Sequence, residues 1–168
     1  MSRIARRVRQ PGVCFVTTDT WQRRRIFLKA EPSSIVLERL FECRQKGVLK
    51  LHSFVLMPEH LHLLMTPGDE TSLEKAVQMI KGGSAYTIGK QLGYRFPIWQ
   101  TRFHDRWIRS THEYRIRKQY IEQDPVKARL SEKASAYPFG SASGAFLLNS
   151  CEFEVVTNCG PQRFEERS

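Results

Sequence analysis

The apolar stretch over residues 54–65 constrains the fold most, because Pro58 interrupts it after only a few residues. A proline has no backbone N–H for a sheet ladder, so we expect two short antiparallel strands, over 48–56 and 60–65, joined by a turn at 57–59. His60 and His62 lie two positions apart in the second strand, where alternate side chains point to the same face. Their imidazoles would form a two-nitrogen clamp for a metal ion, although alternate histidines can also be ordinary half-buried polar residues.

The rest of the pattern predicts a sheet with helices. We expect a strand over 12–18, a helix over 33–46 capped by Ser33 or Ser34, a helix over 71–92, a strand over 104–109 and a last helix over 111–125. Thr71 and Glu74 fit a capping box, Thr111 is expected to cap the last helix and Pro125 to stop it. The order predicts an α+β fold with a ferredoxin-like antiparallel sheet (βαββαβ) and an additional C-terminal helix.

Gly82 and Gly83 fall inside the second predicted helix. Each glycine costs a helix interior roughly 1 kcal/mol relative to alanine. The pair therefore predicts either a kink or the close approach of a ligand.

Composition favours a polyanionic partner. Lysine and arginine outnumber aspartate and glutamate by 27 to 17, and the sequence pI is about 9.8. No apolar run approaches the ~20 residues that span a bilayer, so nucleic acid is favoured over a membrane. The four cysteines form no Cys-x-x-Cys pair, and we interpret them as reduced thiols of a cytoplasmic protein.

The chain divides into three parts. Residues 1–11 carry four arginines and are expected to be a basic N-terminal arm, either contacting phosphate or simply solvated. Residues 12–130 would form one domain of ordinary size. Residues 131–168 are a C-terminal tail whose structure the pattern does not define.

Tyr120 and Asp124 are four positions apart in the last predicted helix, and therefore lie on one face. A phenol has an ordinary pKa near 10 and is a poor nucleophile unless its target is activated. A divalent ion held by His60, His62 and Asp124 could activate a phosphodiester for attack by Tyr120. Alternatively, Tyr120 packs in the core and Asp124 caps the turn at Pro125.

Cations alternate with aromatic side chains over residues 99–109, as in surfaces that stack bases and hold phosphates. Lys81, Arg102 and Arg106 are the residues that we expect to contact nucleic-acid phosphate. The aromatic side chains here could equally belong to the core, and the cations to a solvated face.

Three segments together resemble the REP-associated tyrosine transposases, a group of single-tyrosine transposases of the HUH nuclease class. They are Leu56-Met-Pro-Glu-His-Leu-His-Leu-Leu-Met65, Trp99-Gln-Thr-Arg-Phe-His-Asp-Arg-Trp-Ile108 and Tyr120-Ile-Glu-Gln-Asp-Pro-Val-Lys-Ala-Arg-Leu130. The resemblance implies that residues 12–130 are a catalytic domain that cleaves and rejoins single-stranded DNA near a hairpin, through a 5′-phosphotyrosine intermediate.

The resemblance also implies roles for individual residues. His60 and His62 would bind Mg²⁺ or Mn²⁺, Tyr120 would be the nucleophile, and Asp124 would occupy the position of the third ligand. The family more often has Asn or Gln at that position, but a carboxylate oxygen also suits a hard divalent cation.

Two rival hypotheses remain open. One is a non-catalytic nucleic-acid-binding module on a ferredoxin-like fold, and the other is a degenerate relative in which Asp124 marks a changed role. Related folds assemble the site within one chain or between two, so a homodimer is a further possibility that the sequence leaves open.

Overall fold

A computed structural model of the chain describes residues 12–155, and the predicted basic arm at 1–11 and Cys159 lie outside them. The elements are β1 (Cys14–Asp19), α1 (Ala30–Gln45), β2 (Leu49–Met57), β3 (His60–Pro67), α2 (Leu73–Leu92), β4 (His104–Trp107), α3 (Thr111–Lys127) and α4 (Glu152–Val155). The four strands form one sheet in the order β2-β3-β1-β4, and every neighbouring pair is antiparallel. The α+β, ferredoxin-like prediction is therefore confirmed.

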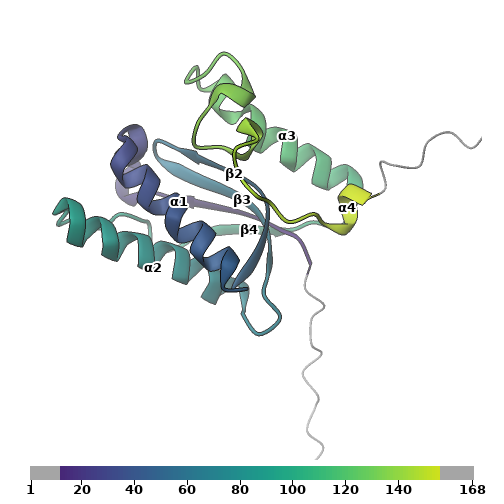
Figure 1. Cartoon of the computed structure of the whole chain (residues 1–168), viewed down its shortest axis with the longest axis horizontal. Helices are drawn as coiled ribbons and strands as arrows, with labels where there is room; N and C mark the ends of the chain where they lie inside the picture. Colours follow the sequence, from purple (N-terminus) through teal and green to yellow (C-terminus); the bar gives the residue numbers. More distant parts are fainter. Residues whose placement is uncertain (1–11, 156–168) are drawn as a thin grey trace, which may run out of the picture.

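The sheet separates two layers of helices. Figure 1 shows α1 and α2 side by side over one face, and α3 over the other. Leu61 and Leu63 of β3 join the core under α1 and α2, whereas Leu64 packs in the core under α3 with Tyr114 and Ile121. The alternation of β3 therefore places His60 and His62 on the α3 face.

A β-bulge in β2 keeps that strand in step with the core. The register against β3 shifts between Leu51 and Ser53, and His52 has no directly paired partner. Because of this extra residue, Leu51 and Phe54 both face the core under α1 and α2, which strict alternation would forbid.

The helix boundaries differ from the predicted ones. α1 begins at Ala30, with Pro32 in its first turn, where a missing N–H costs nothing. Ser33 is not its cap; its hydroxyl donates to the carbonyls of Phe27 and Lys29. The N-cap of α2 is Ser72 rather than Thr71, since its hydroxyl accepts from the Lys75 N–H.

Two further corrections concern α3. Its N-cap is Ser110, whose hydroxyl accepts from the N–H of Glu113, rather than Thr111. Pro125 does not stop the helix, which continues to Lys127. The ring is buried and removes only one backbone hydrogen bond close to the end of the helix, so the last turn still forms.

The predicted glycine kink in α2 is absent, since the helix runs unbroken from Leu73 to Leu92. A Cβ added at Gly83 would lie 2.0 Å from Nε of Arg39, whereas one at Gly82 would meet nothing within 4 Å. Gly83 thus permits a close approach, but by the Arg39 side chain, which donates to the Met79 carbonyl at 2.9 Å.

The chain after α3, for which the sequence predicted no definite structure, returns along β2. Phe139 accepts from the N–H of Leu56, and Asn149 donates its N–H to the carbonyl of Leu51. The Tyr137 hydroxyl donates to the Leu56 carbonyl at 2.7 Å. This segment therefore covers the outer edge of the sheet at β2 (Figure 1).

Candidate functional site

His60 and His62 lie on β3, at the end where the turn from β2 enters it. They pair with Asp19 and Thr17 of β1, so both imidazoles stand beside the central strands of the sheet. Their ring centroids are 4.5 Å apart. The His62 side chain is buried, and His60 is half-buried at the rim.

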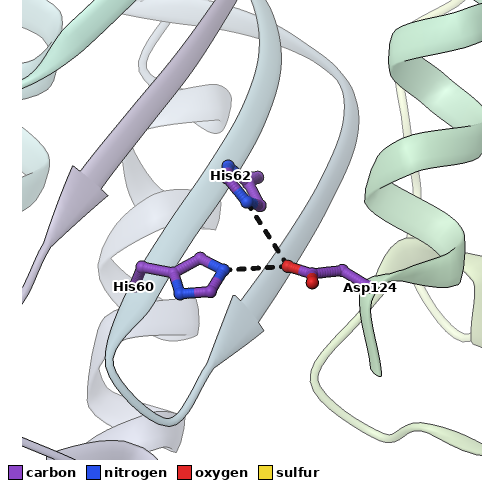
Figure 2. Close-up of side chains that lie close together, drawn as sticks. All are labelled: His60, His62 and Asp124. Atoms are coloured by element: carbon purple, nitrogen blue, oxygen red, sulfur yellow. Dashed lines mark hydrogen bonds and ion pairs between the residues drawn. The ribbon is translucent and has the colours of Figure 1, made fainter. Parts of the chain in front are cut away.

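Asp124 reaches both histidines from α3. Its Oδ2 lies 2.8 Å from Nε2 of His60 and 3.3 Å from Nε2 of His62. Figure 2 shows both contacts as dashed lines. The three ligand atoms all lie within 4.8 Å of one another. Two imidazole nitrogens and one carboxylate oxygen thus converge on a single point between the sheet and the helix.

The environment favours the protonation states that bind a metal ion. Burial alone would raise the pKa of the Asp124 carboxyl, but hydrogen bonds from His60 and His62 outweigh burial and hold this pKa well below its usual value. Burial lowers the pKa of His62 by more than Asp124 raises it. Near neutral pH the site therefore contains an ionised carboxylate and a neutral His62.

Each histidine has a partner behind its ring. Nδ1 of His62 lies 2.8 Å from the Thr17 hydroxyl. Nδ1 of His60 is buried and makes no hydrogen bond among the described residues, although Oε1 of Glu59 lies 3.2 Å away. A metal ion on Nε2 requires the ring proton to sit on Nδ1, where Thr17 and Glu59 could accept it. The residues therefore fit a divalent cation.

Glu59 is itself held by cations. Nη2 of Arg23 lies 3.9 Å from Oε1 of Glu59, and Nε of Arg25 lies 3.7 Å from Oε2. Arg23 and its neighbour Gln22 have φ angles of 51° and 54°, in the left-handed region that costs a non-glycine residue about 1 kcal/mol. The loop after β1 thus adopts a strained backbone where it supports Glu59.

Tyr120 lies one helical turn before Asp124, on the same side of α3. Its ring centroid is 5.4 Å from that of His62, and 40% of the residue is exposed. The ammonium of Lys127 lies 5.6 Å from the centre of the Tyr120 ring. A phenol beside the histidines, open to solvent and near a cation, can meet an anionic substrate.

The three expected phosphate contacts lie in different settings. Lys81 donates from α2 to the backbone carbonyls of Gln100, Thr101 and Arg102, and burial lowers its pKa. Arg102 is exposed on the loop that Lys81 holds. Arg106 of β4 pairs with Glu113 and is also exposed. None of the three belongs to the His60, His62 and Asp124 cluster.

Several residues of the site were not predicted. Lys127 is seven positions after Tyr120, a spacing that returns to the same helix face and could have indicated it. Glu59 is adjacent to His60, but its role depends on a ring nitrogen whose direction the sequence does not reveal. Thr17 could not be found, since only the strand register places it opposite His62.

Comparison with known proteins assigns the chain to a family. A family model described as "Transposase IS200 like" matches residues 15–124, a range that begins in β1 and ends at Asp124. The chain therefore belongs to the IS200-like transposase family.

Within that family the chain is a homologue of the REP-associated tyrosine transposases. It is 26% identical over 142 residues to the REP-associated tyrosine transposase of Escherichia coli (strain K12), covering 84% of this chain and 82% of the relative. A solved structure of a REP-associated tyrosine transposase bound to a REP hairpin superimposes with a TM-score of 0.67 and 25% identity, covering 90% of this chain and 92% of that one. The resemblance found in the sequence is thus confirmed.

A second solved structure shares the fold alone. It is a putative transposase from Deinococcus radiodurans R1, with a TM-score of 0.50, 21% identity, and coverage of 73% of this chain and 97% of that one.

Within residues 12–155, no helix is both long and apolar enough to cross a membrane. Cys14, Cys43 and Cys151 are free thiols.

Proposed function

We propose that this protein is a metal-dependent transesterase of single-stranded DNA, a transposase or nickase that cleaves and rejoins DNA near hairpins. The observation that carries the proposal is the convergence of His60, His62 and Asp124 beside the exposed phenol of Tyr120. Family membership and the homologue bound to a REP hairpin support the choice of DNA as substrate.

In the proposed reaction, Oη of Tyr120 attacks the scissile phosphorus. The bond from phosphorus to the 3′ oxygen breaks, leaving the 5′ phosphate of the downstream DNA fragment esterified to Tyr120. The phenol proton passes to solvent, and the departing 3′ oxygen takes up a proton to become a free hydroxyl. Rejoining reverses these steps with a 3′ hydroxyl as the attacking group.

His60, His62 and Asp124 would hold the Mg²⁺ or Mn²⁺ that this chemistry needs. A bound divalent ion supplies Lewis-acid polarisation of the phosphodiester and offsets charge on the leaving oxygen. Thr17 holds the His62 ring from behind, Glu59 would accept the Nδ1 proton of a metal-bound His60, and the phenol lies one turn of α3 from Asp124. The chain's own residues therefore position the phenol and the imidazole rings and hold the ring protons.

The surface around Tyr120 supplies charge for the DNA backbone. Arg117 is half-buried and lies over the Phe15 ring at 4.9 Å, whereas Lys127 is exposed and lies over the Tyr120 ring. Arg102 and Arg106 remain proposed phosphate contacts, while Lys81 also supports the loop that carries Arg102. We place this reaction in the cytoplasm, where the DNA substrate and free thiols occur together.

A covalent-adduct assay tests the proposal. The wild-type protein and Tyr120→Phe are incubated with labelled hairpin oligonucleotides from the DNA that flanks the gene, with Mn²⁺ or with chelator. We expect a protein-DNA band on a denaturing gel that requires the metal and Tyr120. Tyr86→Phe is the matched control, since Tyr86 is an exposed phenol on α2, across the sheet from the site.

The same assay tests the rival hypothesis. If wild-type protein binds a flanking hairpin yet forms no adduct with Mn²⁺, the transesterase proposal fails and the non-catalytic binding module takes its place. A band that persists in Tyr120→Phe would instead show that another residue is the nucleophile.

A further inference from the structure

A second concave surface lies beside the candidate site and plays no part in the reaction above. It is an open groove of about 450 Å³ between the loop at 24–29 and the segment at 94–96 that follows α2. We call it the Tyr94 groove. This volume is within the ~300–1,000 Å³ range of pockets that hold a small organic ligand, and a single nucleotide is of that size.

Flat aromatic surface forms one wall of the Tyr94 groove. The rings of Tyr94 and Phe96 stack with centroids 5.3 Å apart, and both residues are half-buried. Leu28, opposite in the lining, leaves 57% of its surface exposed. Aromatic rings that are partly accessible in a groove offer stacking surface to an unpaired base.

The remaining lining is cationic. Arg24, Arg25 and Lys29 all line the groove, and none of its lining residues is acidic. The Arg24 guanidinium lies 4.6 Å from the centre of the Phe96 ring, so that charge and stacking surface are adjacent. This combination complements a phosphate attached to a base, whereas an ordinary apolar protein partner would supply no anion for Arg24 and Lys29.

Backbone hydrogen bonds join the groove to the turn that precedes His60. The N–H of Phe27 donates to the Pro58 carbonyl at 3.0 Å, and the N–H of Thr20 donates to the Glu59 carbonyl at 2.9 Å. Arg25 contributes to both places, because it lines the groove and reaches Glu59. The loop that lines the groove is thus held against the turn that leads into His60.

From these observations we propose that the Tyr94 groove binds an unpaired nucleotide in the single-stranded flank of the DNA substrate. The inference rests on the proposed function for its substrate class. A base would stack on the Tyr94 ring, which Phe96 supports from behind, while Arg24 and Lys29 contact the flanking phosphates. Duplex DNA would not enter, since its bases are already stacked and paired.

Binding measurements without cleavage test this inference. The Tyr120→Phe variant, in chelator, is titrated by fluorescence anisotropy with a hairpin that carries an unpaired flank of about six nucleotides, and with the same hairpin without a flank. Replacing both Tyr94 and Phe96 by leucine keeps apolar bulk and removes the flat rings. We expect about tenfold weaker binding of the flanked hairpin and unchanged binding of the blunt one.

Two controls sharpen the comparison. Tyr86→Leu removes an exposed aromatic ring that lies beside Lys90 on α2, outside the groove, and should leave both affinities unchanged. Lys29→Gln should reduce the salt dependence of binding to the flanked hairpin by about one phosphate contact. Thermal unfolding of each variant establishes that it is folded.

The outcomes separate this inference from the proposed function. Equal losses for flanked and blunt hairpins, or no loss for either, would overturn the groove as a nucleotide site. A concentration-dependent dimer in sedimentation that the leucine pair abolishes would assign the groove to a second copy of the chain and also overturn it. Failure of the adduct assay leaves this binding result unaffected, since no step here requires cleavage or metal.

Discussion

Oδ2 of Asp124 lies 2.8 Å from Nε2 of His60, although 64 positions separate the two residues in the chain. The same oxygen lies 3.3 Å from Nε2 of His62. One carboxylate oxygen therefore orients both imidazoles before any ion arrives. The carboxylate at this position can be understood as a ligand matched to its two neighbours.

Replacement of Asp124 by asparagine tests that interpretation. The amide keeps the size of the side chain but removes its negative charge, so we expect Mn²⁺ affinity, measured by isothermal titration calorimetry, to fall about tenfold. The yield of covalent adduct at low Mn²⁺ should fall in parallel. A marked gain in cleavage by Asp124→Asn would contradict this expectation and favour the degenerate relative.

Glu59→Gln addresses the group behind His60. The amide retains the shape of Glu59 but no longer offers a charged acceptor to Nδ1, and loss of such a partner typically weakens metal binding by roughly 10–100-fold. We expect weaker Mn²⁺ binding in calorimetry with little change in thermal stability. Glu70→Gln, at an exposed acid in the loop before α2, is the matched control. Equal metal affinity in the two variants would remove Glu59 from the site.

His52 should make folding sensitive to mild acid. Its Nδ1 donates to the Asn149 carbonyl and its Nε2 accepts from the Thr66 hydroxyl, while burial lowers its pKa below the ordinary 6.5. Between the lowered pKa of native His52 and the ordinary value of 6.5, the unfolded chain binds more protons than the native one. Stability is therefore retained above pH 6.5 and falls as the pH drops from there to the native pKa.

Urea unfolding at about pH 7.5 and about pH 5.5 measures this dependence. His52→Gln should lose less stability between the two values than the wild type does, and His62, whose pKa is also lowered, accounts for part of the remainder. His112→Gln alters an exposed histidine and should behave as the wild type. An unchanged pH dependence in His52→Gln would exclude this role.

The two glycines of α2 should respond differently to alanine. Gly82→Ala meets open space and should raise the free energy of unfolding by about 1 kcal/mol through helix propensity. Gly83→Ala displaces Arg39 from the Met79 carbonyl, which offsets that gain, so no net stabilisation is expected. In an Arg39→Ala background the Gly83→Ala change should become stabilising. Chemical denaturation of the four variants measures these differences.

The sequence predicted only part of the spatial arrangement of His60, His62 and Asp124. Strand alternation put the histidines on one face, and helix spacing linked Asp124 to Tyr120. Neither spacing shows that the two pairs meet in space; their combination into one metal-assisted site was a hypothesis from the residue types, which the resemblance supported. Proximity between α3 and β3 depends on tertiary packing around residues such as Ile121, which periodicity alone does not locate.

Other features depend on interactions between distant parts of the chain. The bulge at His52 is stabilised by Asn149 and Thr66, and no local pattern marks it. Ser33 was expected to cap α1 because serine favours that position, yet its hydroxyl instead bonds to carbonyls of the preceding turn. In each case a contact far away in sequence, or a competing partner nearby, outweighed the local preference.

Tyr120 and Asp124 both lie on α3, whereas His60 and His62 both lie on the sheet. The site is therefore divided between one helix and one strand. Any displacement of α3 would withdraw the proposed nucleophile and one proposed ligand in the same movement. On the proposed function, a centre with a complete ligand set and no phenol to attack would thereby be avoided. Assembly of the proposed site would depend on the docking of this one helix.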